Sequence, residues 1–306
     1  MAKAKRGIYA ASLTPSDASG EPDAGKLAAY CRWNLDQGLD GVAPLGTTGE
    51  GNSLPFEFRI ALPGVFAEAG FASEEVIFGT GSCAAADAVA ATKAATDAGF
   101  YNVLVLPPFY YKNPSDEGLY AYYARLIEGV GDDRLRVYLY HFPQMSMTPI
   151  SIGLLKRLRR QFGAAIAGLK DSSGDFVSTL EFVSALDDFD VYPSNEAVLL
   201  EGLEKGCAGA ISATLNASAA LARATLMAQG DEADRLQSVL ADVRRTIADY
   251  PLSAALKQIE AWRTGDEGWL PVFPPQTGLS EAQSKKLRQA LMALEPESRI
   301  FGSGQP

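Results

Sequence analysis

The sequence predicts an α/β fold, a (β/α)8 TIM barrel with a C-terminal helical appendage. Two observations predict the barrel. Short apolar runs typical of buried strands occur eight times, and segments with apolar residues at helical spacing lie between them. This alternation indicates a parallel sheet, and eight units within about 220 residues suit a closed barrel of about 250 residues. A third observation, the change to helices alone after residue 230, predicts the appendage.

The expected strands end near glycine, proline or small polar residues, as buried strands of parallel sheets do. Their ranges are 7–15, 40–50, 75–82, 101–109, 136–143, 165–173, 189–196 and 209–216. Intervening segments such as DAGKLAAYCRWNLDQG carry apolar residues at helical spacing and end near glycine. A doubly wound sheet is the alternative, but its usual Gly-rich fingerprint is missing from SLTPSDASGEP after the first strand.

The domain organisation predicted from this pattern has two parts. Residues 1–230 form the catalytic barrel, and residues 231–306 form a C-terminal helical subdomain. Within the second part, helices are expected at 231–248, 251–263 and 280–293. The final segment, residues 302–306, is expected to fray.

Charge and hydropathy exclude two classes of partner. The 306-residue chain carries 27 Lys and Arg against 37 Asp and Glu, a net charge of -10 at pH 7. The basic residues form no long cluster that could neutralise a phosphate backbone, so nucleic acid is not an expected partner. No window approaches the roughly 18 apolar residues of a membrane span, so no membrane partner is expected either.

Cysteine and histidine usage predicts no metal site. Cys31, Cys83 and Cys207 are widely spaced and form no CxxC pattern, so neither a disulfide framework nor a zinc site is expected. His141 is the only histidine, and alternation along its strand predicts a packing role facing the helices. Because MAKAKRGIYAASLTPS also lacks the apolar stretch of an export signal, we expect a cytoplasmic protein.

The segment AIAGLKDSSGD places a lysine, Lys170, at the end of a buried strand, where sites of such barrels lie. Tyr140 would face the same interior from the neighbouring strand, about 5 Å away. A desolvated lysine favours the neutral amine that Schiff-base catalysis requires. The alternative is a structural lysine that reaches solvent or pairs with Asp171. In the strand expected at 136–143, strict alternation places Tyr138, Tyr140 and Phe142 on one face. In the strand expected at 165–173, it places Ile166, Gly168 and Lys170 on one face and Ala167, Leu169 and Asp171 on the other.

The turn PLGTTGEGNS, residues 44–53, follows the second expected strand. Its backbone N–H groups and the hydroxyls of Thr47 and Thr48 could form a nest for a carboxylate or phosphate. It lacks the GK[ST] ending of a nucleotide P-loop, so a small anion is the better candidate. The alternative is a plain tight turn with a helix cap.

Four motifs in this order, GTTGEGNSL, PPFYYKNPSDEGLY, YLYHFP and AGLKDSSGD, are highly specific in combination. The chain resembles, from about residue 7 to 295, the dihydrodipicolinate synthase/N-acetylneuraminate lyase family (DapA family) of class I aldolases. The resemblance implies a homotetrameric (β/α)8 lyase that forms an imine with a 2-oxo acid, usually pyruvate. It implies no metal or organic cofactor, because the lysine imine itself is the electron sink.

The resemblance also implies roles for single residues. Lys170 looks like the imine-forming lysine, and Tyr140 looks like the phenol that donates and accepts protons. Thr47 and Thr48 match the pair that binds the 2-oxo acid carboxylate, and Thr48 is also assigned a proton relay through its hydroxyl. Tyr111 matches the tyrosine that crosses a dimer interface into the neighbouring site, so a homodimer or homotetramer is expected.

The chain departs from the synthase branch at Met145, where that branch has an arginine for the carboxylate of its aldehyde substrate. Methionine cannot form that bidentate pair. Ser194 stands at a position that is often glycine. Residues at the ends of strands seven and eight could contact a substrate tail, although helix caps or solvated loops are the alternative. The predicted substrate-binding set is Thr47, Thr48, Ile211, Ser194, Met145, Asn195, Glu196 and Ser212.

The leading functional hypothesis is therefore a class I lyase of a 2-oxo acid. Its reaction would be aldol cleavage or condensation, or dehydration of a 2-keto-3-deoxy sugar acid. One alternative is an authentic 4-hydroxy-tetrahydrodipicolinate (dihydrodipicolinate) synthase. Another, from a different class, is a non-catalytic barrel that binds a 2-oxo acid. Polyhydroxylated and aromatic or aliphatic acceptors all stay open.

Overall fold

The computed structural model describes residues 3–295 and 298–301, so the expected frayed end lies outside the described residues. All eight predicted strands are confirmed within this part of the chain. Every pairing between them is parallel, as the alternation with helices requires. The strands are β1 (Gly7–Ala10), β2 (Gly41–Val42), β3 (Phe78–Gly79), β4 (Asn102–Val105), β5 (Arg136–His141), β6 (Ile166–Asp171), β7 (Asp190–Pro193) and β8 (Gly209–Ser212).

Two sheets join to close the barrel. One has the order β2-β1-β8 and the other β3-β4-β5-β6-β7. The N–H of Ile77 donates to the carbonyl of Val42 at 3.0 Å across one seam, and the N–H of Ala208 donates to Val191 at 2.8 Å across the other. Gly209, with φ of +142°, makes the β1–β8 contact possible, because a Cβ there would lie 1.7 Å from the carbonyl oxygen of Gly7. The predicted (β/α)8 barrel is confirmed.

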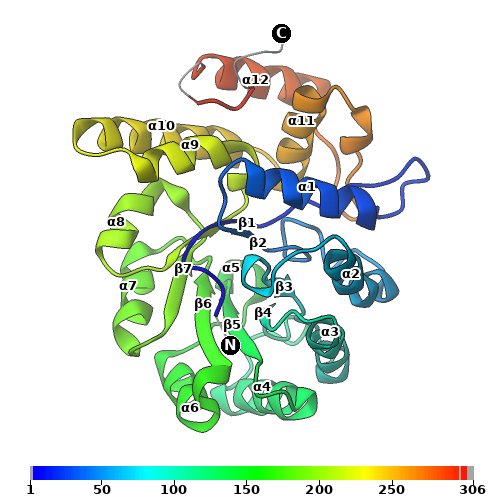
Figure 1. Cartoon of the computed structure of the whole chain (residues 1–306), viewed down its shortest axis with the longest axis vertical. Coiled ribbons are helices and arrows are strands. Elements are labelled where there is room, and N and C mark those ends of the chain that lie inside the picture. Colours follow the sequence, from blue (N-terminus) through cyan, green and yellow to red (C-terminus); the bar gives the residue numbers. More distant parts are fainter. Residues whose placement is uncertain (1–2, 296–297, 302–306) are drawn as a thin grey trace.

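Helices surround the strands, as Figure 1 shows. Their N-termini are capped by the chemistry that the sequence offers: the side chain of Asp23, for example, accepts from the N–H of Lys26 at the start of α1. The helices around the barrel are α1 (Ala24–Asp36), α2 (Phe56–Glu68), α3 (Ala85–Asp97), α4 (Asp116–Val130), α5 (Pro143–Ser146), α6 (Ile152–Phe162), α7 (Phe176–Ala185), α8 (Leu199–Glu204) and α9 (Leu215–Met227). Short 3-10 helices are η1 (Ser73–Glu75), η2 (Gly163–Ala165), η3 (Glu196–Val198) and η4 (Glu267–Trp269).

Three C-terminal helices follow the barrel, as predicted: α10 (Asp231–Ala248), α11 (Leu252–Thr264) and α12 (Glu281–Met292). They gather at one side of the ring, beside α9 and α1 (Figure 1). Leu240 of α10 and Ile259 of α11 share one buried hydrophobic cluster with Ile8 of β1. The division into units of residues 1–230 and 231–306 stays a prediction.

Aromatic side chains fill the barrel interior below the site. Tyr9, Tyr138 and Tyr192 are fully buried, and their rings pack edge to face at centroid distances of 5.9 and 6.0 Å. The hydroxyls of Tyr9 and Tyr192 both donate to the carbonyl of Lys5, before the first strand. The N-terminal end of the barrel is therefore plugged, and the interior opens toward the C-terminal ends of the strands.

One assignment of side chains to faces was wrong. Ile166 belongs to the core between the strands and the helices, whereas Ala167 lies in the barrel interior with Tyr138. The cause is a register shift beside β5: Val137 pairs with Ile166, but Tyr138 pairs with Gly168. One extra residue in β6 breaks the strict alternation at its start.

No helix in residues 3–295 and 298–301 is both long and apolar enough to span a bilayer.

Candidate active site

A cavity of about 590 Å³ lies at the C-terminal ends of the strands, where sites of such barrels occur. Residues from the ends of β5 to β8, from the β2 turn and from the C-terminal helices surround it. Its lining residues are Thr47, Thr48, Glu50, Gly51, Asn52, Ser53, Tyr140, Phe142, Met145, Lys170, Ser172, Gly174, Ser194, Asn195, Ala213, Arg244, Leu252, Ser253, Pro275 and Gln276.

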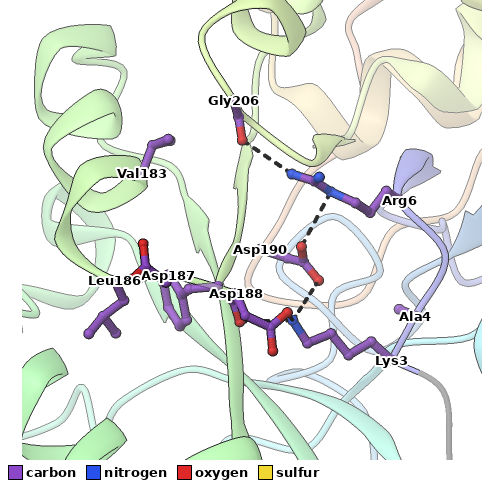
Figure 2. Close-up of a pocket in the computed structure, with 10 residues that line it drawn as sticks. Lys3, Ala4, Arg6, Val183, Leu186, Asp187, Asp188, Asp190 and Gly206 are labelled. Atoms are coloured by element: carbon purple, nitrogen blue, oxygen red, sulfur yellow. Dashed lines mark hydrogen bonds and ion pairs between the residues drawn. The ribbon is translucent and has the colours of Figure 1, made fainter.

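A second cavity, of about 420 Å³, lies at the opposite end of the barrel (Figure 2). Four of its five charged residues pair with one another: Lys3 lies 2.6 Å from Asp188, and Arg6 lies 3.3 Å from Asp190. Arg6 also donates to the carbonyl of Gly206. Because these charges already satisfy one another and the interior above is plugged, the cavity at the C-terminal ends is the candidate active site.

The structure brings Lys170 and Tyr140 together as the alternation predicted. They are paired in register on β6 and β5. The amine of Lys170 donates to the hydroxyl oxygen of Tyr140 at 3.2 Å and lies 4.3 Å from the centroid of its ring. Both residues are 3% exposed and line the cavity. An amine and a phenol thus share one desolvated pocket.

The environment of Tyr140 lowers the pKa of its phenol. Burial raises the pKa of this phenol, but the positive charge of Lys170 and hydrogen bonds with Thr47, Lys170 and Ser172 outweigh it. The net effect is a pKa below the ordinary value of a tyrosine. A phenol of this kind is suited to accept and return a proton beside the amine.

The β2 turn holds two backbone donors without protein partners. The N–H groups of Thr47 and Thr48 have no acceptor in the described part of the chain, and both residues line the cavity. The turn itself is tightly packed, because a Cβ at Gly49 would lie 2.6 Å from the carbonyl oxygen of Ser12. Free, fixed N–H groups of this kind suit a carboxylate.

The relay position differs from the expectation. The resemblance assigned the proton-relay hydroxyl to Thr48, but the hydroxyl of Thr47 lies 3.3 Å from that of Tyr140. The hydroxyl of Thr48 has no hydrogen bond to a described residue. The geometry therefore favours Thr47 for the relay and leaves Thr48 with its backbone N–H as the group for the substrate.

Two contacts from α11 support this turn. The hydroxyl of Ser253 donates to the carbonyl of Thr48 at 3.1 Å. Lys257 forms a fully buried ion pair with Glu50 at 2.6 Å, and the other oxygen of Glu50 accepts from the N–H of Phe273. The turn is thus held from below by the C-terminal helices as well as by the barrel.

The remaining predicted substrate residues divide into two groups. Ser194, Asn195 and Met145 line the cavity, and Asn195 also caps η3 by accepting from the N–H of Ala197. Three residues do not line it, although all were assigned to the substrate: Ile211, whose side chain lies in the barrel interior, and Glu196 and Ser212, which are fully buried beside it.

Glu196 and Ser212 instead hold a cavity residue that the sequence reasoning missed, Arg244 of α10. Its Nη1 donates to Glu196 Oε2 at 3.3 Å, and to the hydroxyls of Ser212 and Thr214 at 2.9 Å each. A signal was available: Arg244 lies four residues after Leu240 and thus beside the buried stripe of an amphipathic helix.

Tyr111 lies away from the other candidate residues within this chain. It is 80% exposed, in the loop after β4, and its ring packs edge to face on that of Tyr110 at 5.2 Å. Neither tyrosine lines the cavity.

His141 is buried: its Nδ1 accepts from the N–H of Ile150 at 3.0 Å, and its ring packs against Phe182. Both contacts fit the packing role expected for the histidine.

A buried amine beside a phenol, at the C-terminal mouth of a (β/α)8 barrel and next to an anion-binding turn, defines a lyase of the class I aldolase kind. Residues 4–294 match the model of the dihydrodipicolinate synthetase family. The chain belongs to this family.

Relatives and solved structures agree with this assignment. An uncharacterized DapA-like lyase of Chloroflexus aurantiacus is 37% identical over 289 residues, which cover 93% of this chain and 95% of the relative. A 4-hydroxy-tetrahydrodipicolinate synthase of Thiobacillus denitrificans is 30% identical over 300 residues, 95% of this chain and 97% of the relative. The crystal structure of dihydrodipicolinate synthase from Agrobacterium tumefaciens superposes with a TM-score of 0.86 at 30% identity, covering 95% of this chain and 100% of that one.

Proposed function

We propose that this enzyme forms an imine between Lys170 and a 2-oxo acid, with pyruvate as the simplest case. The observation that carries the proposal is the 3.2 Å contact between the amine of Lys170 and the hydroxyl of Tyr140 in a desolvated cavity. The free N–H groups of Thr47 and Thr48 supply a site for the carboxylate of the acid. A crystal structure of YagE, a prophage protein of this family from E. coli that is 25% identical, is described as a complex with pyruvate.

The proposed reaction is cleavage of a 4-hydroxy-2-oxo acid or its reverse. The nitrogen of Lys170 bonds to C2, and the carbonyl oxygen leaves as water, which gives a protonated imine. Tyr140, relayed by Thr47, removes the proton of the C4 hydroxyl; the C3–C4 bond breaks, the aldehyde leaves, and the electron pair moves into an enamine. Protonation at C3 and hydrolysis by water release pyruvate and the free lysine. The imine is the electron sink, and we propose no metal or organic cofactor.

Dehydration is open to the same intermediate. Loss of a proton from C3 of the imine and of the hydroxyl from C4 would remove one water from a 2-keto-3-deoxy sugar acid. Both variants use Lys170 and Tyr140 in the same roles.

A second candidate is 4-hydroxy-tetrahydrodipicolinate synthase, the activity for which the relative from Thiobacillus denitrificans is named. Against it stands Met145, which lines the cavity where the resemblance leads us to expect an arginine. Turnover of pyruvate with aspartate semialdehyde at a rate near that of the preferred substrate would favour the synthase.

We further propose a homodimer or homotetramer in which Tyr111 completes the neighbouring site. The support is that Tyr111 is 80% exposed in the β4 loop and lies outside the cavity of its own chain. We also propose a cytoplasmic location. Its support is that Cys31, Cys83 and Cys207 are all free thiols.

The test is intact mass after incubation with pyruvate and borohydride, on the wild type and on Lys170→Ala. We expect a reduced pyruvyl adduct on the wild type alone. The other lysines of the variant serve as the internal control for non-specific labelling. A folded wild-type protein that gives no adduct with any 2-oxo acid would refute the proposed imine.

A further inference from the structure

Arg244 lines the cavity, and one edge of its guanidinium has no partner in the part of the chain that the structure describes. An arginine has five N–H donors, two of them on each terminal nitrogen. The hydrogen-bond partners of Arg244 in the described part of the chain are Glu196, Ser212 and Thr214, and Nη1 alone donates to all three. Nη2 and Nε have no acceptor in the part of the chain that the structure describes. Three N–H donors, including the Nε and Nη2 pair that matches a carboxylate, are therefore left for a ligand.

The arginine is fixed in position before any ligand arrives. Glu196 is 0% exposed and accepts from the hydroxyl of Thr214 as well as from Arg244. About two turns earlier, on the same face of α10, Gln237 donates to the carbonyls of Glu196 and Ala197 at 3.0 and 3.1 Å. The helix is thus bound to the β7 loop at two points, and little side-chain entropy is lost when the arginine binds a ligand.

The charges of the cavity single out this residue. Among the described lining residues, the cationic side chains are Lys170 and Arg244, and the one carboxylate is Glu50. Glu50 is already neutralised by Lys257. If Lys170 is bonded to C2 at the near end of the substrate, Arg244 is the remaining cationic side chain among the described lining residues that can serve the far end.

We propose that Arg244 binds a carboxylate at the far end of the substrate, so that the preferred 2-oxo acid, or the aldehyde released from it, carries a second carboxylate. The inference rests on the proposed function, because it assumes that the near end of the substrate is held at Lys170. A dianionic phosphate suits the site less well, since a single arginine already shared with Glu196 offers too little positive charge. Phe142 and Met145, which also line the cavity, are apolar and offer no rival cation.

The plainer reading is that Arg244 only neutralises the buried Glu196. It predicts that the distal group of the substrate has no influence on binding. The test is therefore a comparison of 2-oxopentanedioate with 2-oxopentanoate, and of 2-oxohexanedioate with 2-oxohexanoate. Each acid is trapped on Lys170 by borohydride, and the concentration that gives half-maximal adduct is measured by intact mass.

In the wild type we expect at least one dicarboxylate to be trapped at a concentration about tenfold or more below that of its monocarboxylate partner, as a bidentate charged pair allows. Arg244→Met should abolish this preference while pyruvate is still trapped. The matched control is Arg245→Met, because Arg245 is exposed, pairs with Asp242 and lies outside the cavity. It should retain the full preference.

Arg244→Met leaves Glu196 buried without its cation, so the double variant Glu196→Gln/Arg244→Met is measured as well. Loss of the preference in the folded double variant supports the proposal, and the single variant should show the same loss. Pyruvate trapping by the wild type without any preference for dicarboxylates, or a preference that survives in the double variant, would overturn this inference alone. A wild type that traps none of these acids would overturn the proposed function, and this inference with it.

Discussion

The hydroxyl of Ser253, at the start of α11, donates a 3.1 Å hydrogen bond to the carbonyl of Thr48 in the β2 turn. A C-terminal helix thus fixes the turn whose N–H groups face the cavity. Ser253→Ala should leave that carbonyl without a partner and loosen the turn, at a cost of about 1 kcal/mol. We expect the pyruvate concentration for half-maximal trapping to rise roughly fivefold. Ser284→Ala on α12, which removes a similar bond to Gln258 on α11, is the control. Equal values for the Ser253 variant and the wild type would contradict the prediction.

The pH dependence of proton transfer should follow Tyr140. A general base acts above its pKa, so the rate of hydrogen exchange at C3 of pyruvate should rise through the lowered pKa of this phenol. Thr47→Val removes a hydrogen bond that lowers this pKa and should move the rising limb to higher pH. Thr48→Val should leave the position of the limb unchanged. Tyr140→Phe should reduce exchange by about 10²- to 10⁴-fold. An identical limb in Thr47→Val and the wild type, measured by NMR, would exclude this assignment.

The buried pair of Lys257 and Glu50 should matter for stability mainly when one partner is lost. Lys257→Met leaves an uncompensated carboxylate in the interior and should lower the free energy of unfolding by about 3–5 kcal/mol. Glu50→Gln/Lys257→Met should recover most of that loss, because the amide oxygen can still accept from Phe273. Urea denaturation measures both. Equal stability of the single and double variants would argue against the pair.

Glu260 predicts a stability change with pH. Burial raises the pKa of this carboxyl to about 7, although Arg263 and Tyr30 oppose the shift. Between its ordinary pKa and about 7, the folded state holds a proton that the unfolded state has released, so stability falls as pH rises through this window. The side chain of Glu260→Gln stays neutral at every pH. The substitution should therefore increase the free energy of unfolding at about pH 8 by up to about 3 kcal/mol, with a higher Tm, and change both little at about pH 4. A stabilisation equal at both pH values would show that titration is not the cause.

Tyr110 and Tyr111 form a natural pair of test and control, because both are exposed in the same loop. If Tyr111 reaches the neighbouring site, Tyr111→Phe should slow C3 exchange by tenfold or more, whereas Tyr110→Phe should not. Light scattering gives the oligomeric state of both variants. A fully active monomer would rule out any role for a tyrosine across an interface.

Much of the fold was predictable because strand and helix periodicities are local properties of the sequence. Lys170 and Tyr140 could be paired in advance, since parallel neighbours bring strand ends together. Ile166 could not be assigned correctly, because the register shift depends on how β5 and β6 meet in space. Arg244 escaped prediction for a similar reason: its place beside the buried stripe of α10 indicates that it lies near the core, but not that this turn of the helix faces a cavity built by other elements.

The cavity draws its walls from Thr47 near one end of the chain to Gln276 near the other. A nascent polypeptide that has just left the ribosome up to residue 230 would contain every strand, yet it would lack Arg244, Ser253 and Gln276. Contacts of such long sequence separation form late, because the chain loses the entropy of loop closure before these contacts stabilise the fold. Lys170 would thus be synthesised well before the residues that complete the cavity around it.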